Sequence, residues 1–511
     1  MLARIDALAM AALSRRRFLT TLGAYLFILL ALRVFMFSGA SEDDAEQLLY
    51  SQIWAFGYKA NQPPLYTWLV LMSQQIFGVT ILSVEAVKFA ALFAMYGFYH
   101  QAARLVLGDD RSVTLATLSL VGFYYIGWDM VMNYSHTVLM GAAIAATLWA
   151  AFRLRDYHDF RDYLFLGLAI GCGLLSKYNY ALFLVALAAA CIADKEFRRV
   201  LRPRNLWLTA AVAAVMVSPH ALWVAFHEVD VTTIHTAPPP EVGVIAYLLD
   251  AGRGLLGLGE GIAAFLSPAI ILMVLFFWRA FGRISGSKIS QPFKRLLEAY
   301  FISVVLMLIL AVAVFRIGDF QNHWLMVLIP FPIYVFLRIK CMEPPDRWLS
   351  RYGVAIGMLA VVVIAGVVGR YVVGPDICRK CNFFLPYEVL AKDLRTAGFD
   401  HGTMISPGFP NQLSGNLRRY FPDSRFVSMR FAPFMPPPRA EQGACIIVWN
   451  AVFGSDRKTW GGYVQFANQN LGTSIGENPA VHLLEAEIPR AGGRRVTLAY
   501  IPVTEEKGSC H

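Results

Sequence analysis

Residues 41–65 read SEDDAEQLLYSQIWAFGYKANQPPL and follow the first long apolar run of the chain, at residues 18–37. Four acids stand at the start of this stretch, aromatic residues come next, and Pro63 and Pro64 close it. The whole chain is 57% hydrophobic and only 16% charged, so we expect an acidic block of this kind to lie at a membrane surface. Carboxylates held there can accept a proton from a hydroxyl group, bind a metal or bind a cation.

The chain as a whole predicts an all-α polytopic membrane protein. Its mean hydropathy is +0.51, and apolar runs of roughly 20 residues, long enough to cross the hydrocarbon core as a helix, recur as far as residue 373. The first run is predicted to be an uncleaved span, because it is too long for a signal peptide and contains Arg33. About eleven crossings follow from the length criterion. They are predicted at residues 18–37, 82–106, 113–132, 135–153, 163–178, 180–194, 206–226, 260–281, 296–315, 322–339 and 353–373.

The net charge of +10 could suggest a nucleic-acid partner, but its distribution argues against one. Lys and Arg gather in alternate short loops, and the positive-inside rule makes these loops cytoplasmic. They hold Arg15, Arg16, Arg17, Arg111, Arg153, Arg155, Arg161, Lys195, Arg198, Arg199, Arg202, Arg204, Arg283, Lys288, Lys294, Arg295, Arg338, Lys340, Arg347 and Arg351. The N-terminus is then cytoplasmic, while residues 38–81, residues 227–259 and the chain after residue 374 face outward.

Residues 374–511 change in character and predict a soluble α/β domain outside the membrane, beside a transmembrane domain at residues 1–373. This part has no spanning run, gains Gly, Pro and charge, and mixes short β-like runs with a helical pattern. An even number of cysteines in an oxidising compartment favours disulfides, with three pairings open. A zinc site at the Cys-x-x-Cys element is the competing interpretation. The four cysteines are Cys378, Cys381, Cys445 and Cys510.

The acidic start of the first outer loop is the candidate for chemistry. A solvated acidic loop is the plain alternative. The spacing of Leu48, Leu49, Ile53 and Phe56 predicts a helix lying on the membrane surface. Such a helix would hold Asp43 near a lipid headgroup, where a carboxylate can act as general base.

Basic residues on the outer side are candidates for a phosphate. Lys177 stands at the outer end of a predicted span, beside Tyr178. It could neutralise a phosphate or simply extend its ammonium into the interface. Lys59 and Arg253 are weaker candidates for the same task. Lys88 follows Glu85 by three residues, which predicts an ion pair within one helix.

Several short motifs occur in an order that resembles a known family. They are Asp43-Asp44-Ala45, Gln62-Pro63-Pro64-Leu65, Gly173 to Tyr178 (GLLSKY), Ser218-Pro219-His220 with Trp223, and Asn322-His323-Trp324 before Pro330. Over roughly residues 15–375 the chain resembles the GT-C glycosyltransferases, in the bacterial branch that is similar to protein mannosyltransferases and to the aminoarabinose transferase of lipid A. In the C-terminal part, Cys-x-x-Cys, Gly415 to Arg418 and Phe421 to Asp423 resemble rhizobial-type transferases, which add galacturonic acid to lipopolysaccharide core or lipid A.

The resemblance implies an inverting transfer of a sugar from a polyprenyl-phosphate donor to a glycolipid acceptor, most simply lipid A or lipopolysaccharide core, in the bacterial inner membrane. It implies that Asp43 activates the acceptor hydroxyl and that Asp44 is a second acid, which orients substrate or helps to hold a metal. A divalent metal remains open as a cofactor. The leaving group is a phosphate, so its charge must be neutralised, and the resemblance gives this role to Lys177.

The chain departs from the family at three outer positions. His136 stands where relatives carry an aspartate, and Asn61 and Gln62 stand where the aminoarabinose enzyme has an acidic and a basic residue. Fewer carboxylates suit a donor sugar that is itself anionic, which favours galacturonate. The remaining candidates for lining the substrate cavity are Gln62, His136, His220 and His323.

Two other classes of protein are alternatives to a glycosyltransferase. A transporter or flippase of lipid-linked sugars typically shows internal repeats and charged centres within spans, and neither feature is evident. The chain has no GxxxxGK[ST] phosphate loop, so an ATPase motor is not indicated. The third class is a structural subunit of an envelope complex, with residues 374–511 as its partner surface.

Overall fold

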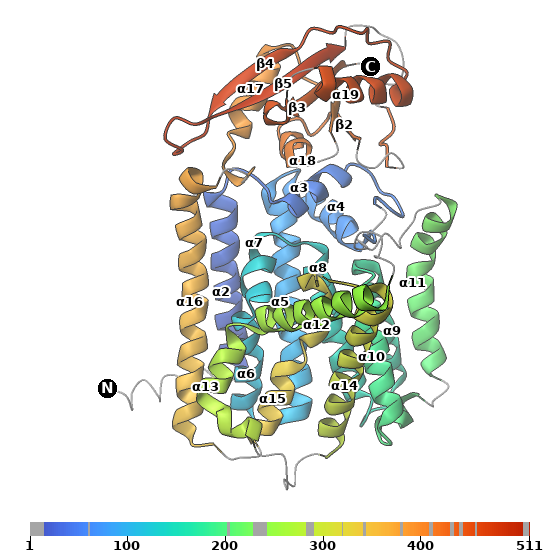
Figure 1. Cartoon of the computed structure of the whole chain (residues 1–511), viewed down its shortest axis with the longest axis vertical. Coiled ribbons are helices and arrows are strands. Elements are labelled where there is room, and N and C mark those ends of the chain that lie inside the picture. The colour runs from blue at the N-terminus through green and yellow to red at the C-terminus, as the bar shows by residue number, and fades with distance from the viewer. Residues whose placement is uncertain are drawn as a thin grey trace.

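The computed structural model describes residues 15–59, 62–201, 205–227, 243–282, 291–318, 320–340, 344–378, 382–407, 412–429, 434–438, 443–454, 457–503 and 510. Its helices form an upright bundle, and a smaller unit that contains a sheet covers one end of that bundle (Figure 1). This arrangement confirms the predicted fold class, a mostly helical multi-pass membrane protein with a C-terminal α/β unit.

Among the described residues, six helical segments are long and apolar enough to cross a bilayer. They belong to α2 (Arg15–Met36), α5 (Ile81–Leu107), α11 (Leu206–Phe226), α14 (Gln291–Phe315), the pair η4 (Asn322–Leu328) and α15 (Phe331–Lys340), and α16 (Asp346–Ile377). Three shorter helices pack among them: α8 (His136–Arg153), α9 (Phe160–Ser176) and α10 (Tyr180–Ala193). The total of about eleven crossings remains a prediction.

The centre of the bundle is the contact between α5 and α8. Residues 141–151 of α8 read GAAIAATLWAA, and nearly all of them are buried. Small side chains let two helices approach closely inside a membrane, where close packing replaces the hydrophobic effect as the force that holds helices together. A Cβ at Gly141 would meet Met95 of α5, so this glycine permits the close approach.

The prediction that residues 113–132 form one regular spanning helix is wrong. The structure divides it into α6 (Asp110–Leu118), the 3-10 turn η1 (Ser119–Gly122), the π-helix η2 (Tyr125–Asp129) and the short α7 (Met130–Met132). The break lies at Phe123, whose backbone is extended and forms a β-bridge with Pro268. Because Phe123 leaves the helical geometry to make this bridge, the chain restarts as a wider π-turn, a geometry that is frequent near functional sites.

The predicted outer loop at residues 227–259 and the predicted span at 260–281 also need correction. Residues Val244–Leu266 form one helix, α12, and a second helix, α13 (Ala269–Gly282), begins only after Ser267 and Pro268. Proline has no backbone N–H and its ring clashes with the preceding turn, so α12 ends at this point. Figure 1 shows α12 running across the bundle instead of along it. Residues 228–242 lie outside the described part of the chain.

The C-terminal unit is built on a mixed five-stranded sheet of order β2-β1-β3-β5-β4. Strand β1 is parallel to both β2 and β3, whereas β5 is antiparallel to β3 and to β4. The strands are β1 (Gly402–Ser406), β2 (Arg425–Ser428), β3 (Ala444–Asn450), β4 (His482–Glu487) and β5 (Arg495–Val503). Three further 3-10 helices are η3 (Phe197–Leu201), η5 (Asn382–Phe384) and η6 (Ala451–Phe453).

Both faces of this sheet are covered by helices, since alternate residues of a strand point to opposite faces. Ile446 and Val448 of β3 pack with α17 (Tyr387–Thr396) and α18 (Gln412–Arg418). Ile447 and Trp449 of the same strand pack with α19 (Arg457–Leu471). The first face also packs against Leu49, Tyr50 and Tyr58 of the first outer loop.

The first outer loop is enclosed between the bundle and the C-terminal unit, so the predicted membrane-surface helix is wrong. Residues Glu42–Tyr50 form α3, and Leu65–Phe77 form α4. Leu48 and Leu49 are fully buried, and Leu49 belongs to the same hydrophobic core as the sheet. An apolar helix face fits a protein surface as well as a bilayer, and here the C-terminal unit covers Leu49 while α4 and α5 cover Leu48. Phe56, by contrast, is 58% exposed.

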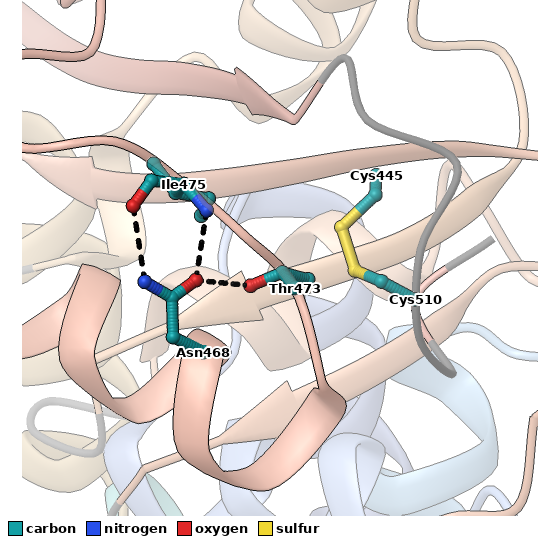
Figure 2. The surroundings of a disulfide bond; sticks show 5 residues. All are labelled: Cys445, Asn468, Thr473, Ile475 and Cys510. Atoms are coloured by element: carbon teal, nitrogen blue, oxygen red, sulfur yellow. Dashed lines mark hydrogen bonds between the residues drawn. A yellow bond between two sulfur atoms is a disulfide. The ribbon is translucent and has the colours of Figure 1, made fainter.

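A disulfide joins Cys445 of β3 to Cys510, the penultimate residue of the chain, and is one of the pairs that the sequence left open (Figure 2). Close to it, the Asn468 side chain bonds to Thr473 and to both backbone groups of Ile475, which fixes the turn after α19. Cys378 follows α16 and is disulfide-bonded. Cys381 lies outside the described residues.

Candidate active site

Asp43 lies in the first turn of α3 and faces the start of α8. Ser41 caps α3, because its Oγ accepts a hydrogen bond from the backbone N–H of Asp44 at 3.2 Å. The Asp43 Oδ2 atom accepts the backbone N–H of Ser135 at 3.3 Å, and the Ser135 hydroxyl lies at 3.5 Å from it. The other carboxylate oxygen of Asp43 has no hydrogen bond to a described residue.

The surroundings of Asp43 raise its pKa to about 6. Burial is the largest cause, and the nearby carboxylates of Glu46 and Asp44 add to it. The ammonium groups of Lys177 and Lys59 act in the opposite direction. A carboxyl group with a pKa near 6 is a stronger base than an ordinary aspartate and is still largely ionised at neutral pH.

Lys177 lies in the turn that follows α9, within electrostatic range of Asp43. Its Nζ donates to the Thr137 hydroxyl at 3.1 Å. Burial lowers the pKa of Lys177 to about 8, although the Asp43 carboxylate acts to raise it. Lys177 forms no ion pair with a described residue, and its ammonium group, which has three N–H donors, keeps capacity to bind an anion.

Lys59 and Glu46 form a second charged pair next to Asp43. Their side chains meet at 2.9 Å, with Glu46 almost fully buried and Lys59 partly open. A β-bridge between Lys59 and Gln62 closes the loop that carries them. The Gln62 Oε1 atom is buried and accepts no hydrogen bond from the described residues. Asn61 lies outside the described part of the chain.

Asp44 has surroundings quite unlike those of its neighbour Asp43. Its Oδ2 accepts hydrogen bonds from Lys88 and from Ser41, both at 2.6 Å. The Arg33 guanidinium lies 3.8 Å away and binds Glu85 at 2.7 Å, and Lys88 pairs with Glu85 at 3.3 Å. All four charged side chains of this network are at most 1% exposed. Asp44 therefore ties α3 to α2 and α5, and the intrahelical pair of Glu85 with Lys88 is confirmed.

His136 serves a similar structural purpose. Thr67 donates to Gln47 Oε1 at 2.7 Å, so the Gln47 amide nitrogen is the donor toward His136 Nε2 at 3.0 Å. His136 Nδ1 then carries the proton and donates to the carbonyl of Ser176 at 3.3 Å. Both ring nitrogens are thereby occupied, and the chain of bonds fixes α3 against the turn that carries Lys177.

Of the other predicted residues, two lie near the first outer loop or Lys177 and one lies apart from them. His220 joins the first loop to α11, since its ring bonds to the Phe56 carbonyl at 2.7 Å and to the Tyr178 hydroxyl at 2.8 Å. His323, in η4, lies close enough to Lys177 to be affected by its charge. Arg253 is 76% exposed on α12 and pairs with Asp250 at 3.6 Å, and no described contact links it to Asp43 or Lys177.

Sequence reasoning missed the hydroxyl groups of Ser135 and Thr137, which contact Asp43 and Lys177. Both lie beside His136, which the sequence analysis had singled out without its neighbours. It also missed Glu46 as the partner of Lys59. Hydroxyl residues are common at the ends of helices, so nothing in the sequence marked these two.

A divalent metal does not fit the acidic residues that are described. No group of three or more His, Cys, Asp or Glu side chains arranged to hold a metal occurs among them. Asp44 is bonded to Lys88 and Glu46 to Lys59, and a metal would have to displace these ammonium groups. We therefore derive no step through a metal.

Comparisons with known proteins show what the chain as a whole is similar to. The family described as dolichyl-phosphate-mannose-protein mannosyltransferase matches residues 61–223. Lipopolysaccharide core galacturonosyltransferase RgtB of Rhizobium johnstonii is 27% identical over 89% of this chain and 91% of its own length. RgtA of the same organism, also a lipopolysaccharide core galacturonosyltransferase, is 28% identical over 84% of this chain and 85% of its own.

Among solved structures, ArnT from Cupriavidus metallidurans, crystallised with undecaprenyl phosphate, aligns with a TM-score of 0.58. The alignment covers 95% of this chain and 98% of ArnT at 12% identity, so it shows a shared fold. The family match, the two relatives and the shared fold together support a multi-pass membrane glycosyltransferase with the fold of ArnT.

Proposed function

We propose that this enzyme moves galacturonic acid from a polyprenyl-phosphate donor to a glycolipid acceptor, lipid A or lipopolysaccharide core. The observation that carries the proposal is the arrangement of Asp43 and Lys177. A carboxyl group with a pKa of about 6 and a lysine without a described ion pair lie within electrostatic range of each other. The arrangement supplies a base for a hydroxyl acceptor and a cation for a phosphate leaving group.

In this mechanism Asp43 accepts the proton of the acceptor hydroxyl while the hydroxyl oxygen bonds to the anomeric carbon of the sugar. The bond from that carbon to the phosphate oxygen breaks on the opposite side, so the anomeric configuration inverts. The polyprenyl phosphate leaves as an anion, and Lys177 stabilises the charge that it gains. Lys59 adds positive charge nearby while it remains paired with Glu46.

The choice of sugar and acceptor rests on the relatives. RgtA and RgtB are named as lipopolysaccharide core galacturonosyltransferases, and RgtD of the same organism, 26% identical over 53% of this chain, as a lipid A galacturonosyltransferase. ArnT was crystallised with undecaprenyl phosphate. A uronic acid is an anion, and the cations of Lys59 and Lys177 near Asp43 suit it better than an additional carboxylate would.

We propose the bacterial inner membrane as the location, with the N-terminus in the cytoplasm and α3 and the C-terminal unit on the periplasmic side. The asymmetry of Lys and Arg between alternate loops supports this orientation. In this arrangement residues 1–373 form the catalytic transmembrane domain and residues 374–511 a periplasmic domain. A lipid-linked donor and a lipid-bound acceptor would then both reach Asp43 from the outer leaflet.

The test is transfer by the purified chain in proteoliposomes that contain a polyprenyl-phosphate galacturonate and a lipid A or core acceptor. Mass spectrometry should show the acceptor heavier by one uronic acid. Asp43→Asn keeps the size of the side chain but removes the base, and we expect transfer to be at least about a hundredfold slower. A flippase or a structural subunit would leave the mass of the acceptor unchanged. Turnover by Asp43→Asn at the wild-type rate would refute Asp43 as the base.

A further inference from the structure

The short helix α18 of the C-terminal unit lies against α3, the helix that carries Asp43. Figure 1 shows the two helices together at the boundary between the bundle and the sheet. A nine-residue helix such as α3 is too short to be stable by itself, so its position is decided by what it contacts. The membrane helices hold α3 through Asp44, and α18 holds it from the other side.

The first contact lies at the N-terminal end of α3. The Asn416 side chain of α18 accepts a hydrogen bond from the backbone N–H of Ala40 at 2.7 Å. Ala40 directly precedes Ser41, the residue that caps α3. Asn416 is completely buried, so this bond is made without competition from water and fixes the point at which the chain enters α3.

The second contact lies at the middle of α3, where Gly415 packs against the Ala45 carbonyl. A Cβ placed on Gly415 would overlap backbone atoms of Ala45. A flexible side chain could move out of the way of such a Cβ, but the backbone of a helix cannot. Glycine at this position therefore sets how closely α18 approaches α3. Any larger residue must move one helix relative to the other.

The third contact lies at the C-terminal end of α3. The Arg418 guanidinium donates to the Leu48 carbonyl, to the Ser51 carbonyl at 2.9 Å and to the Ser51 hydroxyl at 3.0 Å. The last carbonyls of a helix have no partner within it and carry partial negative charge, so an arginine stabilises them in two ways.

Gln52, the residue after Ser51, connects the C-terminal end of α3 to the sheet. The amide of Gln52 accepts the backbone N–H of Phe426 at 2.8 Å and donates to the Phe426 carbonyl at 3.0 Å. Phe426 lies in β2, which is an edge strand. The Gln52 side chain thus pairs with the open edge of the sheet as a further strand would.

We propose that Gly415, Asn416 and Arg418 are positioning residues of the transfer reaction, because they fix α3 at both ends and in the middle and so set where the Asp43 carboxylate meets the acceptor hydroxyl. This rests on the proposed role of Asp43 as the base. A reacting group displaced by about 1 Å can lose on the order of a hundredfold in rate. The C-terminal unit therefore contributes to the chemical step without touching substrate.

The test compares two variants with matched controls in the full-length enzyme in proteoliposomes, with turnover expressed per folded enzyme. Gly415→Ala moves α18 away from α3, and Arg418→Met removes the hydrogen bonds but keeps the length of the side chain. Gly461→Ala is the control glycine, since a Cβ on it meets nothing within 4 Å. Arg495→Met is the control arginine, since Arg495 is 64% exposed and pairs only with Glu485 among the described residues.

We expect kcat to fall roughly 10- to 100-fold in Gly415→Ala and Arg418→Met, with the donor KM within about threefold of wild type. The acid limb of the pH profile should move to lower pH in both, because loosening α3 lets water reach Asp43. Arg418→Lys restores one donor and should recover part of kcat. Both controls should behave as wild type.

Wild-type kcat and an unchanged acid limb in both Gly415→Ala and Arg418→Met would overturn the positioning role. A loss of folded protein with normal turnover by the folded fraction would also overturn it, because the contact would then serve stability alone. Asp43→Asn separates this inference from the proposed function. If Asp43→Asn is inactive while the two variants are normal, only the positioning role fails. If Asp43→Asn is active, the assignment of the base fails first.

Discussion

The Asp44 carboxylate and the Lys88 ammonium lie 2.6 Å apart, and neither side chain is more than 1% exposed. The pair connects the first turn of α3 to the N-terminal third of α5, with Arg33 and Glu85 completing a network of two positive and two negative charges. Each charge is compensated, which is the condition for charges to be tolerated in a protein interior. The adjacent Asp43, by contrast, bonds to Ser135 and lies within electrostatic range of Lys177.

Lys88→Met should destabilise the folded enzyme. It leaves Asp44 and Glu85 with Arg33 as their only cationic partner among the described residues, and the loss of one partner from a buried pair typically costs about 3–5 kcal/mol. Arg495→Met breaks an exposed pair and should cost no more than about 1 kcal/mol. Thermal unfolding of the two variants in the same detergent compares them. Equal melting temperatures would mean that the network contributes nothing to holding α3.

Lys177→Ala should impair the transfer reaction without loss of folded protein. Removal of a cation that stabilises a leaving phosphate typically costs a few kcal/mol of transition-state stabilisation, which lowers kcat/KM on the order of a hundredfold. Arg253→Ala is the matched control, because that arginine is 76% exposed on α12. Steady-state kinetics with the lipid-linked donor measures both. Normal kinetics for Lys177→Ala, or an equal loss in the two variants, would argue against a phosphate contact at Lys177.

The pH profile of kcat/KM should be bell-shaped. Asp43 acts as a base only when ionised, and its raised pKa of about 6 means that activity falls as the pH drops below that value. Lys177 neutralises phosphate only when protonated, and its lowered pKa of about 8 means that activity falls again above that value. Lys177→Arg, which stays charged, should extend activity to higher pH. A profile that is flat between pH 5 and 9 would exclude both groups from the reaction.

The orientation in the membrane can be tested by labelling single cysteines in intact cells. Asp400 in the C-terminal unit and Asp346 at the start of α16 have side chains 81% and 84% exposed, so both positions are accessible to a reagent in the right compartment. We expect a membrane-impermeant maleimide to label Asp400→Cys and to label Asp346→Cys only after lysis. The opposite pattern would place α3 and its acids on the cytoplasmic side.

The sequence by itself determined the class of the protein, because long apolar runs and the asymmetry of Lys and Arg are local and additive signals. It also pointed to Asp43 and Lys177, since a charged residue at the outer end of a span stands out against an apolar background. The short β-like runs at residues 444–448 and 496–501 likewise predicted strands without help from the rest of the chain.

Only the tertiary structure decided what distinguishes Asp43 from Asp44. Adjacent residues on a helix point about 100° apart, so one carboxylate faces Ser135 and Lys177 while the other faces Lys88 and Arg33. The burial of Leu48 and Leu49 was decided in the same way, because an apolar helix face fits a bilayer and a protein core equally well. Only the fold shows that the helical bundle covers Leu48 and the C-terminal unit covers Leu49. The bond from Arg418 to α3 joins residues 367 positions apart, a distance over which no local pattern in a single sequence carries information.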